Sequence, residues 1–311
     1  MNFVAAVVAA VMSLFQAPSI APQASVLFAG DMMFDRTVRT AMQRNGGDFI
    51  FFCIDPFLKR ADAVVANLEG PITDSPSRSV GSLPGSPNNF IFTFPRTTGQ
   101  LLYDHHIRIV NYGNNHILNF GVSGLDNTEK VLDDAGVAYF GQAAGRNWVY
   151  RTSIGGVPLE FINYNEFSAQ RGAASTTIAQ IMSAKGDGYL PVVYTHWGIE
   201  YETTAPQYLR DLAHRFVDAG AVAVVGSHPH VVQDHEIYTS TSLGTSHSAP
   251  IYYSLGNFIF DQYFSDDVKK GLLLQLSFGT STVTGIEEIP ITLNKDRTVC
   301  PDTKSDMGLR N

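Results

Sequence analysis

The sequence alternates short apolar runs with segments of helical periodicity, and this alternation limits the possible folds most strongly. The apolar runs are rich in Val, Ile, Ala and Tyr and have no regular polar position, which is typical of strands covered on both faces. Amphipathic helical spacing recurs at 124–136 and 208–220, and each segment ends in a glycine. The pattern indicates an α/β fold. The strand-like runs are 25–30, 62–68, 107–112, 192–195, 221–226 and 251–256.

Two other segments complete the expected domain. Residues 71–89 are rich in Pro, Ser and Gly, which predicts a long surface loop. After Lys269, two apolar stretches around a polar turn predict a pair of antiparallel strands. The sequence contains no internal repeat and no interdomain linker. We therefore expect one domain at 25–295, followed by a tail at 296–311.

The N-terminal stretch is apolar from Phe3 to Phe15, apart from Ser13. It is shorter than the ~20 residues that a membrane-spanning helix needs. The stretch resembles the apolar region of a signal peptide, although no Lys or Arg precedes it. We expect residues 1–24 to be a signal peptide or an uncleaved anchor, which would make the protein secreted or membrane-anchored outside the cytoplasm. The alternatives are an ordinary N-terminal helix and a cytoplasmic location.

Composition excludes one class of partner and narrows the chemistry of any metal site. The formal net charge is −8 and no Lys/Arg run reverses it locally, which argues against nucleic-acid binding. Cys53 and Cys300 lie far apart, so they form neither a CxxC pair nor a disulfide framework. One long-range disulfide remains open. Any bound metal is therefore expected to have nitrogen and oxygen ligands.

Short polar clusters follow the six strand-like runs. In open α/β sheets, ligands bind beyond the carboxyl ends of the strands, so we expect these clusters to converge. Asp, Glu, Asn and His without Cys suit a divalent cation such as Zn, Mn or Fe. With one shared carboxylate, the set could hold two ions about 3.5–4 Å apart. The residues are Asp31, Asn67, Glu69, Asn114, Asn115, His116, His196, His228, His230 and Asn257.

Each cluster also has a simpler interpretation. Taken alone, Asp31 fits a cap for a helix over 35–44, and Glu69 fits a solvated loop acid. Asn114 and Asn115 fit turn positions. A lone HxH such as His228–His230 is more often structural than metal-binding. The coincidence of six clusters favours a shared site. The other histidines are expected to be surface or packing residues: His105, His106, His214, His235 and His247.

At these same residues the sequence resembles the bacterial capsule-synthesis CapA (poly-gamma-glutamate biosynthesis) family. The resemblance spans roughly residues 26–278, with its stretches in the family's order. It implies a layered, calcineurin-like metallophosphoesterase fold: an α-β-β-α sandwich with mixed β-sheets, which the C-terminal antiparallel segment would extend. The matching stretches are "AGDMMFDR", "ANLEG", "NNHILNFGVSGLDNTEKVLDDAGVAYFG", "THWGIEY", "GSHPHVVQ" and "YSLGNFIFDQ".

The resemblance also implies roles for single residues. Glu69 stands where the metallophosphoesterase fold usually has a bridging Asp. His116 resembles the histidine that protonates a leaving group or orients phosphate. Arg36 could bind an anionic substrate or form a salt bridge on the first helix, and Asn257 is a further catalytic candidate. The implied ligands of one or two Mn, Fe or Zn ions are Asp31, Glu69, Asn115, His196, His228 and His230.

Two departures from the family pattern bear on activity. Met33 stands where metallophosphoesterases generally have a histidine ligand, as is typical of the CapA branch. Asn119 stands where the CapA family usually has Asp, which removes a charge near the site. Both weaken the inference of a fully loaded two-metal hydrolase.

Two functions therefore remain open. The first is a metal-dependent hydrolase of a phosphoester or of a bond in an anionic cell-envelope polymer. The second is a non-catalytic assembly or export component of the polymer-synthesis complex, with a structural or vestigial metal. Either function would involve membrane-bound polymer-synthesis proteins as partners.

Overall fold

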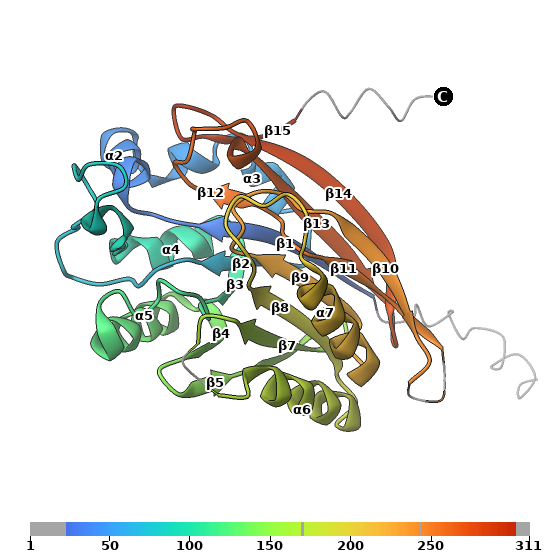
Figure 1. The fold of residues 1–311 in the computed structure, drawn as a ribbon. Helices are drawn as coiled ribbons and strands as arrows, with labels where there is room; N and C mark the ends of the chain where they lie inside the picture. Colours follow the sequence, from blue (N-terminus) through green and yellow to red (C-terminus); the bar gives the residue numbers. More distant parts are fainter. Residues whose placement is uncertain (1–22, 169–170, 243, 245, 303–311) are drawn as a thin grey trace, which may run out of the picture.

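The structure is a computed structural model that describes residues 23–168, 171–242, 244 and 246–302. The predicted signal peptide or anchor and most of the predicted tail lie outside the described residues. Two mixed β-sheets form the centre of the described part, and helices lie on both outer faces (Figure 1).

The first sheet has nine strands in the order β15-β14-β13-β1-β2-β3-β4-β5, and β12 pairs with β1 beside this path. β1 to β4 run parallel, while β13, β14 and β15 are antiparallel to their neighbours. The strands are β1 (Ala24–Met32), β2 (Ala63–Leu68), β3 (Ile107–Asn111), β4 (Ala138–Ala143), β5 (Arg146–Trp148), β12 (Asn257–Ile259), β13 (Lys270–Phe278), β14 (Val283–Leu293) and β15 (Val299–Pro301).

The second sheet has six strands in the order β10-β11-β9-β8-β7-β6. Its four inner strands run parallel, and β10 and β6 are antiparallel edges. The strands are β6 (Tyr150–Ile154), β7 (Val157–Asn165), β8 (Leu190–His196), β9 (Ala223–Ser227), β10 (His235–Ser240) and β11 (His247–Tyr252).

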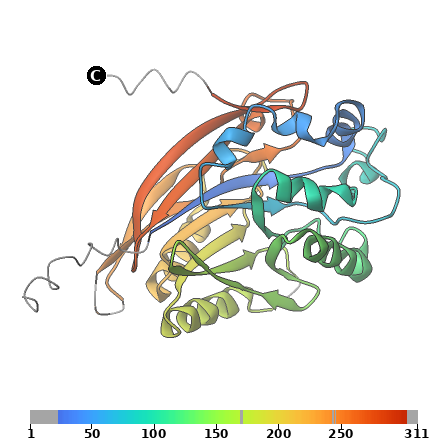
Figure 2. The same cartoon turned by 180° about the vertical axis from the view of Figure 1, so that it is seen from behind.

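Helices cover the outer face of each sheet. α7 lies in front of the second sheet in Figure 1, whereas α4 and α5 are in front in the reverse view of Figure 2. The helices are α2 (Arg36–Asn45), α3 (Asp55–Leu58), α4 (Thr97–Asp104), α5 (Gly121–Ala135), α6 (Ala173–Gly186) and α7 (Gln207–Ala219). Short 3₁₀ helices are η1 (Gly47–Phe51), η2 (Pro87–Phe90) and η3 (Asp267–Lys269).

Three apolar clusters hold these layers together. Phe28, Val65 and Phe161 belong to the cluster between the two sheets. A second cluster joins the other face of β1 and β2 to α2, α4 and α5, and a third joins β8 to α6 and α7. Because successive strand residues face opposite sides, strands buried on both faces are continuously apolar. The layers follow the expected α-β-β-α order.

Most of the predicted elements are present. The six apolar runs correspond to β1, β2, β3, β8, β9 and β11, and the two helical segments to α5 and α7. The predicted C-terminal pair is β13 and β14. The last run differs, because β11 ends at Tyr252 and Asn257 begins β12. Gly256 separates them with φ 68°, a left-handed conformation that favours glycine.

The two cysteines form the long-range disulfide that the sequence left open. Cys53 follows η1, and Cys300 lies in β15, 247 residues further along the chain. β15 also pairs with β14, so ordered structure continues past the predicted boundary at 295. Among the described residues, no helix is long and apolar enough to cross a membrane.

Candidate metal centre

The carboxyl ends of the parallel strands meet at one edge of the sandwich, where the polar clusters converge as expected. Asp31 lies in β1, and Glu69 directly follows β2. His196 ends β8. His228 and His230 follow β9. All five side chains are buried, at 4% exposure or less, so they belong to a built site and do not face solvent as loop or cap residues.

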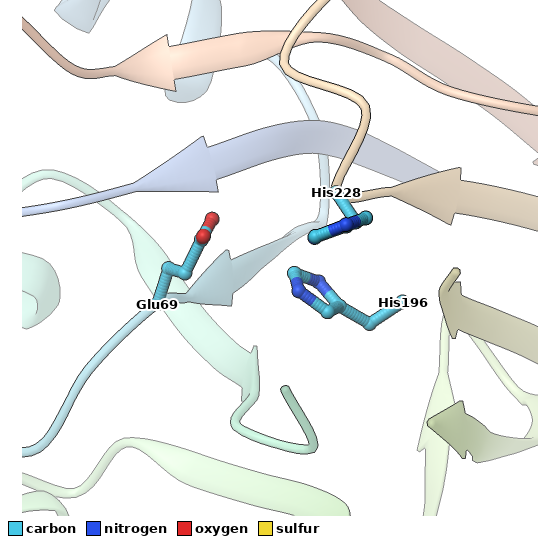
Figure 3. A group of neighbouring side chains, drawn as sticks. All are labelled: Glu69, His196 and His228. Atoms are coloured by element: carbon cyan, nitrogen blue, oxygen red, sulfur yellow. The ribbon is translucent and has the colours of Figure 1, made fainter. Parts of the chain in front are cut away.

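Glu69, His196 and His228 form the first group of candidate ligands. One ligand atom from each lies within 4.8 Å of the other two. Figure 3 shows the Glu69 carboxylate and the two imidazole rings lying around a common space. Glu69 follows β2 of the first sheet, whereas His196 ends β8 and His228 follows β9 of the second sheet. The group therefore exists only when the two sheets are packed together.

A second group consists of Asp31, Glu69 and His230, again with ligand atoms within 4.8 Å of one another. His230 Nδ1 lies 3.5 Å from Asp31 Oδ2, and its Nε2 lies 3.6 Å from Glu69 Oε1. Glu69 is common to both groups. A carboxylate shared between two groups is the arrangement that bridges two ions in two-metal sites.

Two buried atoms at this centre have no hydrogen-bond partner among the described residues. They are Glu69 Oε1 and His228 Nδ1. Leaving a buried polar atom unpaired costs about 1–3 kcal/mol, so such atoms point to a missing partner. Both are able to act as metal ligands, because imidazole nitrogen and carboxylate oxygen suit Zn, Mn or Fe. The residues therefore fit a divalent cation.

Burial favours the neutral form of two candidate ligands, His196 and His228. Burial first, and then the nearby His228, hold the pKa of His196 well below its usual value. Burial together with His230 lowers the pKa of His228 to about 3. Neutral imidazole is the form that binds metals, so both rings are ready to act as ligands at neutral pH.

The pKa values of Asp31 and Glu69 are shifted in opposite directions. Burial alone would raise the pKa of Asp31, but hydrogen bonding with His230 and the charges of His230 and His196 hold it well below its usual range. Burial and the adjacent Asp31 raise the pKa of Glu69 well above its usual value. A cation bound beside both carboxylates would lower the pKa of Glu69, because a positive charge favours the ionised form of a carboxylate.

His196 is oriented by Ser227. The Ser227 hydroxyl donates to Thr195 O at 2.9 Å, so its oxygen is available to accept from His196 Nδ1, 3.0 Å away. Asn67 Nδ2 is also 3.3 Å from Nδ1, but the Ser227 contact is shorter. On its other side, His196 Nε2 lies 2.9 Å from Asn115 Oδ1. The two candidate ligand atoms are therefore neighbours.

Asn67 connects the ligands from behind. Its Nδ2 donates to Asp31 Oδ1 at 2.8 Å. Its Oδ1 accepts from Asn111 Nδ2 at 2.9 Å and from Asn114 Nδ2 at 3.1 Å. Hydrogen bonds behind metal ligands fix their orientation. Asn67 and Asn114 were recognised only as cluster members and Asn111 was missed, although its polar position at the end of β3 was a signal.

His116 lies beside the second group as a neutral imidazole. Asn119 Oδ1 accepts from the Phe92 amide at 2.8 Å and lies 3.2 Å from His116 Nδ1. His116 therefore carries its proton on Nδ1, and Nε2 lies 3.9 Å from Glu69 Oε1. Burial lowers the pKa of His116 to about 4. A neutral ring can accept a proton at Nε2, and the role of His116 toward a leaving group or a phosphate stays a prediction.

Arg36 and Asn257, the other catalytic candidates, face the centre less directly. Arg36 Nη2 pairs with Asp261 Oδ1 at 2.6 Å, which is the salt-bridge alternative. Asn257 Oδ1 lies 3.0 Å from His230 Nδ1, and its Nδ2 donates to His230 O at 3.2 Å. Asn257 thus lies behind His230 and orients it. Contact of Arg36 with a substrate stays a prediction.

Comparison with known proteins shows the family to which the chain belongs. The model of the family described as bacterial capsule synthesis protein PGA_cap matches residues 25–262. The chain belongs to this family.

Two curated relatives are similar to this chain over most of its length. "PGA biosynthesis protein CapA" of Bacillus subtilis (strain 168) is 29% identical over 255 residues, covering 76% of this chain and 63% of its own length. "Capsule biosynthesis protein CapA" of Bacillus anthracis is 28% identical over 291 residues, covering 87% of this chain and 68% of its own. The chain thus spans about two thirds of the length of these relatives.

One solved structure, TT1561 of Thermus thermophilus, covers 83% of this chain and 99% of its own at 11% identity. Its TM-score is 0.42, and we draw no conclusion from it.

The structure shows the surroundings of Met33 and Asn119, the two residues that depart from the family pattern. Met33 is fully buried in the apolar cluster beneath α2, and its Sδ accepts from the Asp35 amide at 3.0 Å. It therefore adds no ligand to the second group. Asn119, where the resemblance implies an Asp, is neutral and therefore adds no charge beside His116.

The remaining histidines lie away from the centre, as expected. His105 is buried, lies 2.7 Å from Asp55 and stacks on Phe51. His214 stacks on Tyr238 with ring centroids 3.9 Å apart. These contacts belong to packing and to surface ion pairs.

Proposed function

We propose that this PGA_cap protein is a metal-dependent hydrolase in capsule or poly-gamma-glutamate biosynthesis. Its substrate would be a phosphoester or a bond in an anionic envelope polymer. The observation that supports this most directly is Glu69, which is common to two groups of candidate ligands. The relatives named for capsule and PGA biosynthesis support the biological context.

The chemistry divides between the cation and the chain. A divalent cation, when bound, would polarise the scissile group and make water a stronger nucleophile near neutral pH. His116, neutral with a free Nε2 lone pair, would accept a proton from that water. Ser227 and Asn257 would hold His196 and His230 in the orientation that ligation requires.

We also propose that the protein acts outside the cytoplasm, beside membrane-bound polymer-synthesis proteins. The Cys53–Cys300 disulfide supports this location, since such bonds persist in oxidising compartments. The apolar stretch at the N-terminus agrees with it.

The test compares metal content and hydrolysis in the full chain and in two variants. We expect about one or two equivalents of Mn, Fe or Zn in the parent by elemental analysis, and hydrolysis of bis(p-nitrophenyl) phosphate after metal loading. His228→Ala should lose both. The control, His235→Ala, removes an exposed histidine that stacks on Tyr252 and should change neither. A metal-loaded parent without turnover on phosphoesters or on the polymer would instead support the non-catalytic role.

A further inference from the structure

We propose that Glu166, which lies outside both groups of candidate ligands, is a positioning residue for the metal centre. It holds in place a turn that packs on the segment carrying two ligand histidines. This inference rests on the metal centre of the proposed function and adds a residue on which that centre depends. The turn consists of residues 198–201, which leave the end of β8, and we call it the supporting turn.

The backbone of Glu166 is fixed beside the candidate ligand His196. Asn165, the last residue of β7, lies opposite His196 in the parallel pairing of β7 with β8. The next N–H along the chain, that of Glu166, donates to His196 O at 3.0 Å. Glu166 therefore starts from a strand end that is hydrogen-bonded to the strand end carrying a ligand.

Both oxygens of the Glu166 carboxylate have a partner. Oε2 accepts from the backbone N–H of Gly198 at 2.7 Å, and Oε1 accepts from the Tyr208 hydroxyl of α7 at 3.0 Å. Gly198 is buried, so its N–H needs a partner within the protein. A carboxylate is a strong acceptor, because its charge strengthens the hydrogen bond. Glu166 therefore fixes the beginning of the supporting turn.

The supporting turn packs on Pro229, which lies between His228 and His230. The Tyr201 N–H donates to Pro229 O at 2.8 Å. At the beginning of the turn, a Cβ added to Gly198 would lie 3.6 Å from Pro229 Cγ. Both histidines have left-handed backbone conformations, which non-glycine residues keep only where surrounding contacts hold them. The turn supplies such contacts to the residue between the two candidate ligands.

Glu166 also sets the position of an aromatic ring beside the first ligand group. Phe167 is the next residue, and its ring lies 4.3 Å from the His228 ring and 5.8 Å from the His196 ring. Apolar side chains around a metal control the access of water to it. A shift of Glu166 would therefore disturb the ligands through two routes, the supporting turn and the Phe167 ring.

The experiment measures the affinity of the full chain for Zn(II) and Co(II) by competition with a chelating dye, together with the visible absorption of the Co(II)-loaded protein. Glu166→Ala removes the acceptor of the Gly198 N–H. We expect metal affinity to fall about tenfold, at the lower end of the loss that follows removal of a direct partner of a metal ligand. The Co(II) absorption should change as well. Glu166→Gln keeps an oxygen acceptor and should restore both readouts.

Tyr208→Phe is the matched control, because it removes the second hydrogen bond of Glu166 and leaves the one to Gly198. It should keep the affinity and the absorption of the parent. An equal loss in Tyr208→Phe and Glu166→Ala would mean that Glu166 acts by attaching α7, and would overturn the inference. Parent affinity and absorption in Glu166→Ala would overturn it too.

Gly198→Ala tests the same step independently and decides it if Glu166→Ala does not fold. Gly198 has φ 90°, which strains an added Cβ, and that Cβ would lie 3.3 Å from Leu209. The substitution displaces the supporting turn while Glu166 stays intact, so metal affinity should fall again. Unchanged affinity would show that the turn does not position the ligands.

Hydrolysis of bis(p-nitrophenyl) phosphate is measured on the same samples and separates this inference from the proposed function. Weaker metal binding in Glu166→Ala, with no turnover even in the metal-loaded parent, would refute the hydrolase and leave the positioning role standing. Turnover in the parent, with unchanged metal affinity in Glu166→Ala, would do the reverse.

Discussion

His228 and His230 both have left-handed backbone conformations, with φ 100° and φ 58°. Arg36 and Tyr201 line a pocket beside His230, and they share this feature with φ 47° and φ 69°. Such conformations cost about 1–3 kcal/mol each in non-glycine residues and cluster at functional sites. The backbone is therefore strained at these candidate ligands, and the surrounding hydrogen bonds keep it in the strained conformation.

Glu69→Gln separates stability from metal binding. The carboxyl group is buried beside Asp31, which disfavours its ionised form, and Gln keeps the shape without the charge. We expect the metal-free variant to melt at the same temperature as the parent or higher, while bound metal falls below a tenth of the parent value. Calorimetry and elemental analysis test this, with exposed Glu287→Gln as the control. A variant that keeps its metal would remove Glu69 from the ligand set.

Asn67→Ala tests the hydrogen bonds behind the ligands. Loss of such contacts typically costs about 10–100-fold in metal affinity. We expect a loss in this range, measured by competition with a chelating dye, while circular dichroism stays that of the parent. Asn88→Ala, an exposed asparagine in η2, should leave the affinity unchanged. If both variants bind equally well, Asn67 does not orient the ligands.

At the scale of elements, the position of β12 against β1 brings Asn257 opposite Asp31. A Cβ added at Gly30 would lie 1.8 Å from Gly256 O, so the two segments approach this closely only because residue 30 is glycine. Asn257 in turn contacts His230, so the pairing of β12 with β1 connects Asp31 to His230.

Gly30→Ala should therefore harm both the fold and the site. Overpacking of this kind costs about 1–3 kcal/mol, and displacement of β12 should also lower the metal affinity. Gly186→Ala is the matched control, because a Cβ built there meets no atom of the described residues within 4 Å beyond its chain neighbours and the backbone of its own helix. Urea unfolding and metal titration measure both effects. Equal midpoints for the two variants would contradict this view of the β1–β12 contact.

The sequence predicted the elements whose strands are apolar on both faces, and with them the convergence of the candidate ligands. It did not predict β7, whose run includes Glu160 and Asn163. These polar residues can be buried because each has a partner. Arg151 pairs with Glu160, and the backbone N–H of Gln142 donates to Asn163 Oδ1. These partners lie on other strands, and the hydrophobic periodicity of the sequence does not reveal them. Because β7 was not predicted, Asn165 at its end and the nearby Phe167 were not predicted as residues that line a pocket beside Asn115.

At the scale of the whole molecule, the disulfide ties the segment after η1 to β15. Cross-linking residues so far apart restricts the unfolded chain, and typical disulfides contribute about 2–4 kcal/mol. We expect Cys53→Ser/Cys300→Ser to lose stability in this range in urea unfolding, with no change in metal content. Dithiothreitol should lower the parent's midpoint and leave that of the variant unchanged. A midpoint insensitive to both treatments would refute a stabilising role.

The order of strands in the first sheet also bears on how a ribosome-bound chain acquires its shape. β1 lies between β2 and β13, which come from opposite ends of the domain. Until β13 has been synthesised, the edge of β1 that later pairs with β13 has no partner strand from it. Unpaired strand edges tend to pair with other chains. His228 and His230 also emerge long after Asp31 and Glu69. The complete set of candidate ligands is therefore available only after most of the domain has been synthesised.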